Sequence, residues 1–286
     1  MTWSTCSGKA LICGFACLLI SSIFARSEQR KDIEYSNVAG VSLKLDANVP
    51  DGPGPFPTVI IVHGGGFTGG NKQVYVTPIF EPLTRAGFTW FSIDYRLAPQ
   101  YPFPAAIEDV DHAIEWVKAH AAEYKVDTGR IALLGESAGG HLVSYVGTQR
   151  DPRWRVAAVV SFYGPHNLMG EYEMRQRQKK EPTALEAFLN IKTFDAQAFK
   201  RLKQASPINH VRKGMPPYLL LHGTNDELVD YQQSVQMCAR MKRAGDSCEL
   251  YTVEGAGHGM GSWEKTPAYK QKVVDWLQQV MAPPPR

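Results

Sequence analysis

The alternation of hydrophobic and polar positions predicts a parallel sheet whose strands are separated by helices. Short continuous runs of Val, Ile, Leu and Phe recur along the chain, with longer mixed stretches between them. Such runs are typical of strands that are buried on both faces of a parallel sheet. The predicted strands are 58–62, 88–93, 131–134, 157–162, 218–221 and 250–253. Strands that alternate with helices predict a doubly wound α/β fold.

The predicted helices follow from the spacing of apolar residues between these strands. Apolar side chains recur at helical spacing over 105–121, and similar patterns cover 231–241 and 267–280. Two further strand patterns, 32–36 and 41–49, come before the Pro- and Gly-rich loop 50–57. They predict an antiparallel edge on the sheet.

The first 25 residues have a different composition from the rest of the chain. Lys9 precedes the 16-residue apolar run 10–25, which predicts a signal peptide cleaved near Ala25. The run is shorter than the roughly 20 residues that span a bilayer, so we expect no stable membrane insertion after cleavage. An uncleaved anchor is the alternative, because Ile23 stands where a small residue is usual. The expected location is secreted or periplasmic, with one α/β domain over 26–286.

One interval inside that domain lacks a strand pattern. Residues 165–206 are polar and contain short helical pieces such as 183–189. A long interval of this kind predicts a lid inserted above the sheet.

The charge of the chain indicates which partners to expect, and its cysteines indicate the redox compartment. The formal net charge is +3, and the basic run 175–180 is interpreted as a solvated helix face, so no nucleic-acid partner is expected. Cys238 and Cys248 are the only cysteines after the leader, and they lie on either side of a turn at Gly245. They predict a disulfide between a helix and a strand in an oxidising compartment. The alternative is a pair of unpaired buried thiols.

The strongest chemical signal is a glycine-flanked serine between a predicted strand and a helix. Gly135-Glu136-Ser137-Ala138-Gly139 directly follows the strand 131–134. Small flanking residues allow a sharp turn that lifts the serine hydroxyl above the carboxyl end of the sheet. Ser137 is therefore the predicted nucleophile.

A second glycine-rich loop follows the strand 58–62. In His63-Gly64-Gly65-Gly66 the glycines allow backbone N–H groups to face a reacting carbonyl oxygen. The N–H groups of Gly65, Gly66 and Ala138 are the predicted oxyanion hole, in which one donor contributes about 3 kcal/mol. We interpret His63 as structural.

The acid and the base are expected after the last two strands. Asp226 follows the strand 218–221, and His258 lies on a Gly-rich loop after the strand 250–253. These positions give the chain order Ser, Asp, His that is typical of α/β-hydrolases. Asp226 could instead cap a helix, and Asp230 is the rival acid. His222 is expected to brace the turn.

These loops together resemble the HGGG-type esterases of the α/β-hydrolase superfamily. Residues 94–99 and 101–105 also resemble carboxylesterases of the hormone-sensitive-lipase type, and Asp94 and Arg96 are expected to form a buried pair. Only 37 residues (26–62) precede His63 in the expected mature chain, too few for the N-terminal cap of that group. Through residues 67–72 the chain is more similar to a compact branch linked to acetyl, feruloyl and other carbohydrate-borne esters.

The resemblance implies a secreted serine esterase that works through an acyl-enzyme, with no metal or organic cofactor. Its expected substrates are small-molecule or carbohydrate-linked esters with short acyl chains, and Phe67, Tyr163 and Trp263 are candidate substrate contacts. Two alternatives stay open: a serine peptidase of the prolyl-oligopeptidase type, and an inactive binding protein on a hydrolase fold. The sequence makes no prediction of the oligomeric state.

Overall fold

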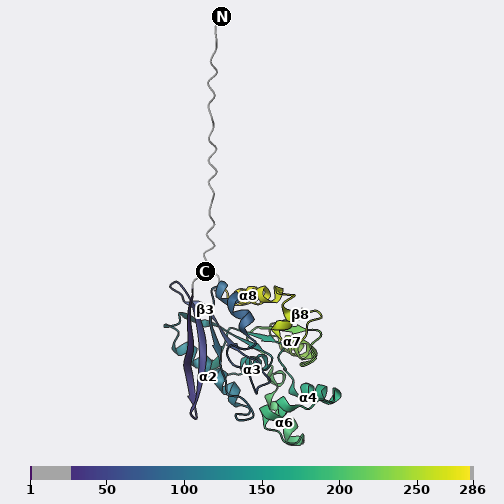
Figure 1. The fold of residues 1–286 in the computed structure, drawn as a ribbon. Helices are drawn as coiled ribbons and strands as arrows, with labels where there is room; N and C mark the ends of the chain where they lie inside the picture. The colour runs from purple at the N-terminus through teal and green to yellow at the C-terminus, as the bar shows by residue number, and fades with distance from the viewer. Residues whose placement is uncertain (2–26, 284–286) are drawn as a thin grey trace.

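The computed structural model describes Met1 and residues 27–283, which contain a single eight-stranded sheet (Figure 1). The predicted signal peptide lies outside the described residues. The strand order is β1-β2-β4-β3-β5-β6-β7-β8. The first two strands form the predicted antiparallel edge, and β2 is also antiparallel to β4, whereas every later pair is parallel. The strands are β1 (Ser27–Val38), β2 (Val41–Pro50), β3 (Phe56–Val62), β4 (Thr89–Ile93), β5 (Val126–Glu136), β6 (Ala158–Phe162), β7 (Tyr218–Gly223) and β8 (Cys248–Val253).

The predicted α/β fold is confirmed, and the hydrophobic runs mark where the strands are buried. All residues of β4, β6 and β7 are buried, as expected for strands that are covered on both faces. Two strands begin five residues earlier than predicted: β1 at Ser27 rather than at residue 32, and β5 at Val126 rather than at Ile131. In β5, residues 127–130 (Asp-Thr-Gly-Arg) separate Val126 from the apolar run and are not buried, so they carry no hydrophobic signal.

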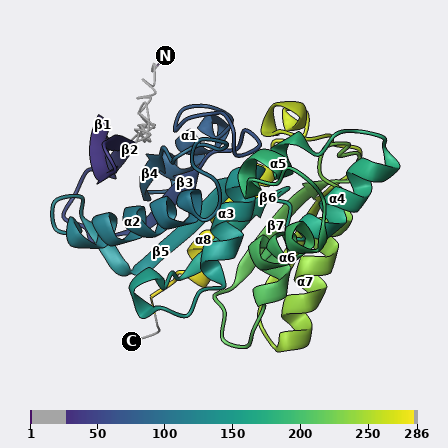
Figure 2. The same cartoon turned by 90° about the horizontal axis from the view of Figure 1, so that it is seen from below.

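Helices cover both faces of the sheet (Figure 2). The cluster on one face includes side chains from α2 (Ala105–Ala119), α3 (Ala138–Gly147) and α7 (Gln232–Ala244). The cluster on the other face includes α1 (Phe80–Arg85) and α8 (Ala268–Val280). In the part of the chain that the structure describes, none of the helices is both long enough and apolar enough to cross a membrane.

The interval between β6 and β7 is more helical than its sequence suggests. It contains α4 (Leu168–Arg177), α5 (Thr183–Leu189) and α6 (Ala196–Ala205). Asn167 and Asp195 cap α4 and α6 by accepting hydrogen bonds from Gly170 N and Ala198 N. Figure 1 shows α4 and α6 beside the end of the sheet where β8 lies.

The predicted pair between Asp94 and Arg96 is wrong. The Arg96 Nε group donates to Asp109 Oδ1 at 2.9 Å, and the Arg96 backbone N–H donates to Asp109 Oδ2 at 2.7 Å. Asp94 instead accepts a hydrogen bond from Lys72 N at 2.8 Å. Asp109 belongs to α2, so the true partner depends on how that helix packs and not on sequence proximity.

The predicted disulfide is present in the structure. Cys238 on α7 is bonded to Cys248 at the start of β8, and their Cα atoms are 5.3 Å apart. Gly245, with φ of +87°, ends α7 and lets the chain reverse into β8. The disulfide therefore joins a helix to the outermost strand on that side of the sheet.

Candidate active site

Ser137 lies at a strained turn between β5 and α3. Its φ of 53° and ψ of −115° are unusual for a residue with a side chain. A Cβ atom on Gly135 would lie 2.2 Å from Gly139 O, and one on Gly139 would lie 2.2 Å from Val62 O. Both glycines are therefore required by close backbone contacts, and the turn presents the serine hydroxyl beyond the carboxyl end of β5.

Three side chains that are far apart in the sequence meet at this edge of the sheet. His258 Nε2 lies 2.9 Å from Ser137 Oγ, and His258 Nδ1 lies 2.7 Å from Asp226 Oδ2. These distances fit a serine hydroxyl that donates to the imidazole and an imidazole N–H that donates to the carboxylate. The three residues follow β5, β7 and β8, so the parallel sheet brings them to a common rim.

The environment of Asp226 favours its charged form. Its side chain is fully buried, and Oδ1 accepts hydrogen bonds from Leu228 N and Val229 N, both at 2.9 Å. Burial alone would raise the pKa of Asp226, but hydrogen bonds from His222 and His258 outweigh it and hold the pKa well below its usual value. Asp226 thus organises its own loop and contacts His258.

The rival acid, Asp230, lies elsewhere. Its Oδ1 accepts a hydrogen bond from Gln232 N at 2.9 Å at the start of α7. His222, predicted to brace the turn, lies with Nδ1 2.8 Å from Ser234 Oγ and Nε2 3.0 Å from Val229 O. It connects β7 to the start of α7 and to the loop that carries Asp226.

The glycine-rich loop after β3 faces Ser137 across a shared cavity. Gly65 and Gly66 have φ of +107° and +60°, which few other residues adopt. No hydrogen bond among the described residues uses the N–H of Gly65, Gly66 or Ala138 as a donor. These three groups are available to a ligand oxygen.

His63 lies behind this loop. Its Nδ1 is 2.7 Å from Gly64 O, and its ring stacks on Tyr95 with centroids 4.3 Å apart. Burial lowers the pKa of His63 to about 4, so the ring is neutral at pH 7. These contacts support the loop and involve none of Ser137, Asp226 and His258.

A cavity of about 370 Å³ opens beside Ser137 and His258. Its walls include the two glycine loops, residues 182–185 of the interval between β6 and β7, and the pair Leu228 and Val229. Phe67 also lines it, and its ring stacks on Phe188 with centroids 3.9 Å apart.

The other two aromatic candidates do not line this cavity. Tyr163 and Trp263 are completely buried. The Tyr163 ring lies 4.5 Å from the His258 ring, and Trp263 Nε1 donates to Gly257 O at 2.8 Å. Both side chains pack behind the loop that carries His258. Their positions near strand ends suggested a place in the site, but such a position does not determine which way a side chain faces.

Sequence reasoning missed two charged residues in the cavity wall. Glu171 and Arg175 of α4 line it and form an ion pair, with Arg175 Nε 2.8 Å from Glu171 Oε1. The prediction that the basic run 175–180 is a solvated helix face is wrong for Arg175, whose side chain is only 21% exposed. An acid and a base four residues apart are also typical of exposed helices, so the sequence offers no distinguishing signal.

Glu136, the residue before Ser137, was also missed. It lines the cavity but is only 3% exposed, and burial raises the pKa of its carboxyl. A Cβ on Gly64 would overlap Glu136 Oε2, which explains why this loop position must be glycine. The sequence offers one sign that Glu136 lies near the site, which is its position directly before Ser137.

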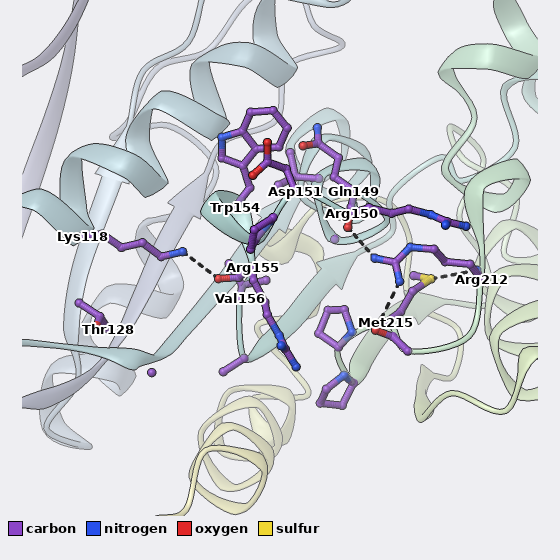
Figure 3. A pocket seen from close by; sticks show the side chains of 18 residues that line it. Lys118, Thr128, Gln149, Arg150, Asp151, Trp154, Arg155, Val156, Arg212 and Met215 are labelled. Carbon is purple, nitrogen blue, oxygen red and sulfur yellow. Dashed lines mark hydrogen bonds between the residues drawn. The ribbon is translucent and has the colours of Figure 1, made fainter.

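A larger cavity of about 760 Å³ lies away from these residues (Figure 3). Its lining includes Ala157 and Pro217, which directly precede β6 and β7, so it opens at the amino ends of the parallel strands. Arg212 donates to Thr148 O at 3.1 Å and to Gln149 O at 2.6 Å, just past the end of α3. A cation is favourable at a helix carboxyl end, so these contacts stabilise the fold. Within residues 27–283, no cluster of three or more His, Cys, Asp or Glu side chains could hold a metal ion.

The mostly parallel sheet and the serine turn after β5 define the α/β-hydrolase fold. The chain belongs to the BD-FAE family, whose model matches residues 45–241. A similar curated relative is the probable carboxylic ester hydrolase LipM of Mycobacterium tuberculosis, which is 35% identical over 210 residues. That match covers 69% of this chain and 48% of LipM, so the chain spans about half the length of this relative.

Two solved structures with similar folds are esterases. A truncated carbohydrate esterase from gut microbiota has a TM-score of 0.78 and 25% identity, over 92% of this chain and 99% of that one. An esterase from the planctomycete Thermogutta terrifontis has a TM-score of 0.69 and 26% identity, over 91% of this chain and 93% of that one.

Proposed function

We propose that this protein is a serine carboxylic-ester hydrolase with Ser137 as nucleophile, His258 as general base and Asp226 as the acid that orients the histidine. The observation that carries the proposal is the continuous hydrogen-bond chain from Asp226 through His258 to Ser137, beside a cavity. Membership of the BD-FAE family and the esterase relatives support the same class.

In this proposal the Ser137 oxygen attacks the ester carbonyl carbon while His258 Nε2 accepts the serine proton. The carbonyl oxygen becomes an oxyanion held by the N–H groups of Gly65, Gly66 and Ala138. His258 then gives its proton to the departing alcohol, and an acyl-enzyme remains. Water, deprotonated by His258, releases the acid and restores Ser137.

Asp226 serves this cycle by staying ionised. Its lowered pKa keeps a negative charge beside His258 Nδ1 at every pH at which the enzyme would work. The charge holds the tautomer whose Nε2 can accept the serine proton, and it stabilises the imidazolium that follows.

We further propose that the substrates are short-chain acyl, acetyl or feruloyl esters, in particular those linked to carbohydrates. A cavity of about 370 Å³ is near the lower limit of ligand sites, which favours small acyl groups. The similar gut esterase acts on carbohydrates according to its name. Of the three aromatic candidates, Phe67 is the one that lines the cavity, together with Tyr75, and we propose that it contacts the substrate.

We also propose that the chain is exported and that 165–206 acts as a lid. The apolar run 10–25 and the disulfide between Cys238 and Cys248 support export. The lid is supported by the residues near Pro182 that form part of the cavity wall. Mass spectrometry of the exported protein should find an N-terminus near Arg26, and retention of the first residues on exported protein would contradict cleavage.

The test of the central proposal is active-site labelling with a fluorophosphonate, followed by peptide mapping. We expect label on Ser137 in the folded protein and none in Ser137→Ala. Ser144→Ala is the matched control, because Ser144 is a buried serine two turns further along α3. Folded protein that takes up no label would reject the hydrolase and favour a binding protein.

A substrate panel tests the acyl preference. Acetate, butyrate, decanoate and ferulate aryl esters would be compared, with Ser137→Ala as the blank. Fastest turnover of decanoate would contradict the short-acyl proposal. Cleavage of prolyl peptides in preference to every ester would point to a peptidase.

A further inference from the structure

Glu171 is a half-paired carboxylate in the wall of the proposed active site. The residue is only 5% exposed and lines the same cavity as Ser137 and His258. One oxygen, Oε1, accepts a hydrogen bond from Arg175 Nε at 2.8 Å. The other, Oε2, is buried and has no partner among the described residues. A buried carboxylate oxygen without a donor is unfavourable, so a missing donor is expected.

Arg175 fixes the position of this carboxylate relative to the proposed triad. Besides holding Glu171, Arg175 donates through Nη2 to Leu228 O at 3.0 Å. Leu228 N in turn donates to Asp226 Oδ1 at 2.9 Å. Arg175 is therefore bound at two points, to Glu171 Oε1 and to Leu228 O, and through Oε1 it limits the movement of the carboxylate, as is needed of a recognition group that discriminates between ligands.

The charges around the cavity indicate what kind of donor would fit. Glu136, Glu171 and Glu181 line it, whereas Arg175 is the only Lys or Arg among its described lining residues. Arg175 already binds Glu171 and Leu228. An anionic ligand would meet this excess of carboxylates, so a neutral ligand that carries hydroxyl groups fits better.

We propose that Glu171, held by Arg175, accepts a hydrogen bond from a hydroxyl group of the ester substrate and so selects hydroxylated esters such as partly acylated sugars. This inference rests on the proposed esterase function. An ester without that hydroxyl would leave the carboxylate oxygen unpaired, and sites built to bind a hydroxyl discriminate strongly against analogues that lack it.

The first experiment compares two acetates of a methyl xyloside, one with free hydroxyls and one in which they are replaced by hydrogen. The enzymes are wild type, Glu171→Gln and Glu173→Gln, and 4-nitrophenyl acetate is the third substrate. Glu173 is the matched control because it lies on the same helix but is exposed. The amide keeps the size of Glu171 and removes its charge.

We expect wild type to prefer the hydroxylated acetate. Glu171→Gln should lower kcat/KM for that acetate at least about 10-fold more than for the deoxy acetate or 4-nitrophenyl acetate, as expected for a lost hydrogen bond to a charged group. Glu173→Gln should match wild type on all three. Equal losses on all substrates in Glu171→Gln, or no loss on the hydroxylated one, would overturn the inference.

A second comparison locates the hydroxyl. Methyl ferulate has a phenolic hydroxyl on the acyl side, and methyl 3,4-dimethoxycinnamate does not. A selective loss on the sugar acetate but not on ferulate would support recognition on the alcohol side, and a loss on both would show that Glu171 also accepts a hydrogen bond from a hydroxyl on the acyl side.

The wild-type preference alone keeps the inference testable if Glu171→Gln does not fold, because wild type that treats both xyloside acetates alike would also reject it. The proposed function fails separately, if Ser137→Ala still hydrolyses esters. Where Ser137→Ala is inactive and Glu171→Gln behaves like Glu173→Gln, only the present inference fails.

Discussion

A methyl group added at Gly139 should separate the two loops that build the proposed active site. In Gly139→Ala the new Cβ would lie 2.2 Å from Val62 O and 2.5 Å from His63 O. Both oxygens belong to backbone at the end of β3, directly before Gly64 to Gly66, so neither can rotate away. Reaching even a 3.0 Å separation from Val62 O requires a shift of about 0.8 Å.

That shift would move the proposed oxyanion donors relative to Ser137. Loss of one such donor costs about 3 kcal/mol of transition-state stabilisation, and a displacement near 1 Å can cost 100-fold in rate. We therefore expect kcat for 4-nitrophenyl acetate to fall at least about 100-fold in Gly139→Ala. The melting temperature should also fall, because α3 and β3 are both part of the core.

The control is Gly261→Ala, in which the new Cβ would have no neighbour within 4 Å. The assay is steady-state hydrolysis together with the rate of fluorophosphonate labelling and a thermal melt for each variant. Activity and stability in Gly139→Ala that match those of Gly261→Ala would refute the close packing of α3 against the end of β3.

Three further changes test other parts of the structure. Asp226→Asn should lower kcat about 100- to 10,000-fold in steady-state assays, because a neutral amide no longer holds the His258 tautomer, and an unchanged kcat would exclude Asp226 from the triad. Burial raises the pKa of Asp111 to about 7 in the folded protein. The free energy of unfolding therefore falls as the pH rises from about 4 to about 7, by at most about 4 kcal/mol, and stays lowered above that pH. Asp111→Asn should thus raise the melting temperature at pH 8 and not at pH 4, and a shift of equal size at both would contradict this. Replacing Cys238 and Cys248 with Ser should lower the free energy of unfolding by about 2 to 3 kcal/mol in urea titrations while leaving kcat unchanged, and a large loss of kcat would show that the disulfide shapes the site.

The parts of the molecule that the sequence predicts well are those whose signal is local. A buried parallel strand is a continuous apolar run, so β3, β4, β6 and β7 are visible in the sequence. The serine turn is visible because its glycines are required by contacts within the turn and with the adjacent strand. The prediction that Ser137, Asp226 and His258 lie at one edge of the sheet follows from the parallel strands, because the loops after parallel strands all lie at the same edge.

The predictions that failed depended on which distant element packs against a residue. Arg96 follows β4 and pairs with Asp109 of α2, and no local pattern specifies that contact between a loop and a later helix. Tyr163 and Trp263 follow strands near the site, but they turn into the core behind His258. In each case the residue type correctly suggested a side-chain contact, but the partner and the direction of the side chain are set by the tertiary fold.

The interval between β6 and β7 illustrates why the specificity of this chain is harder to predict than its chemistry. Glu171 and Arg175 have the spacing of an ordinary surface ion pair on a helix, and only the folded structure shows that they line a cavity. A polar side chain on the inner face of a helix weakens the amphipathic pattern that would have indicated which face is buried. The local signal is therefore lost at the residues that could recognise a substrate, because a recognition group must be polar where the fold alone would place an apolar side chain.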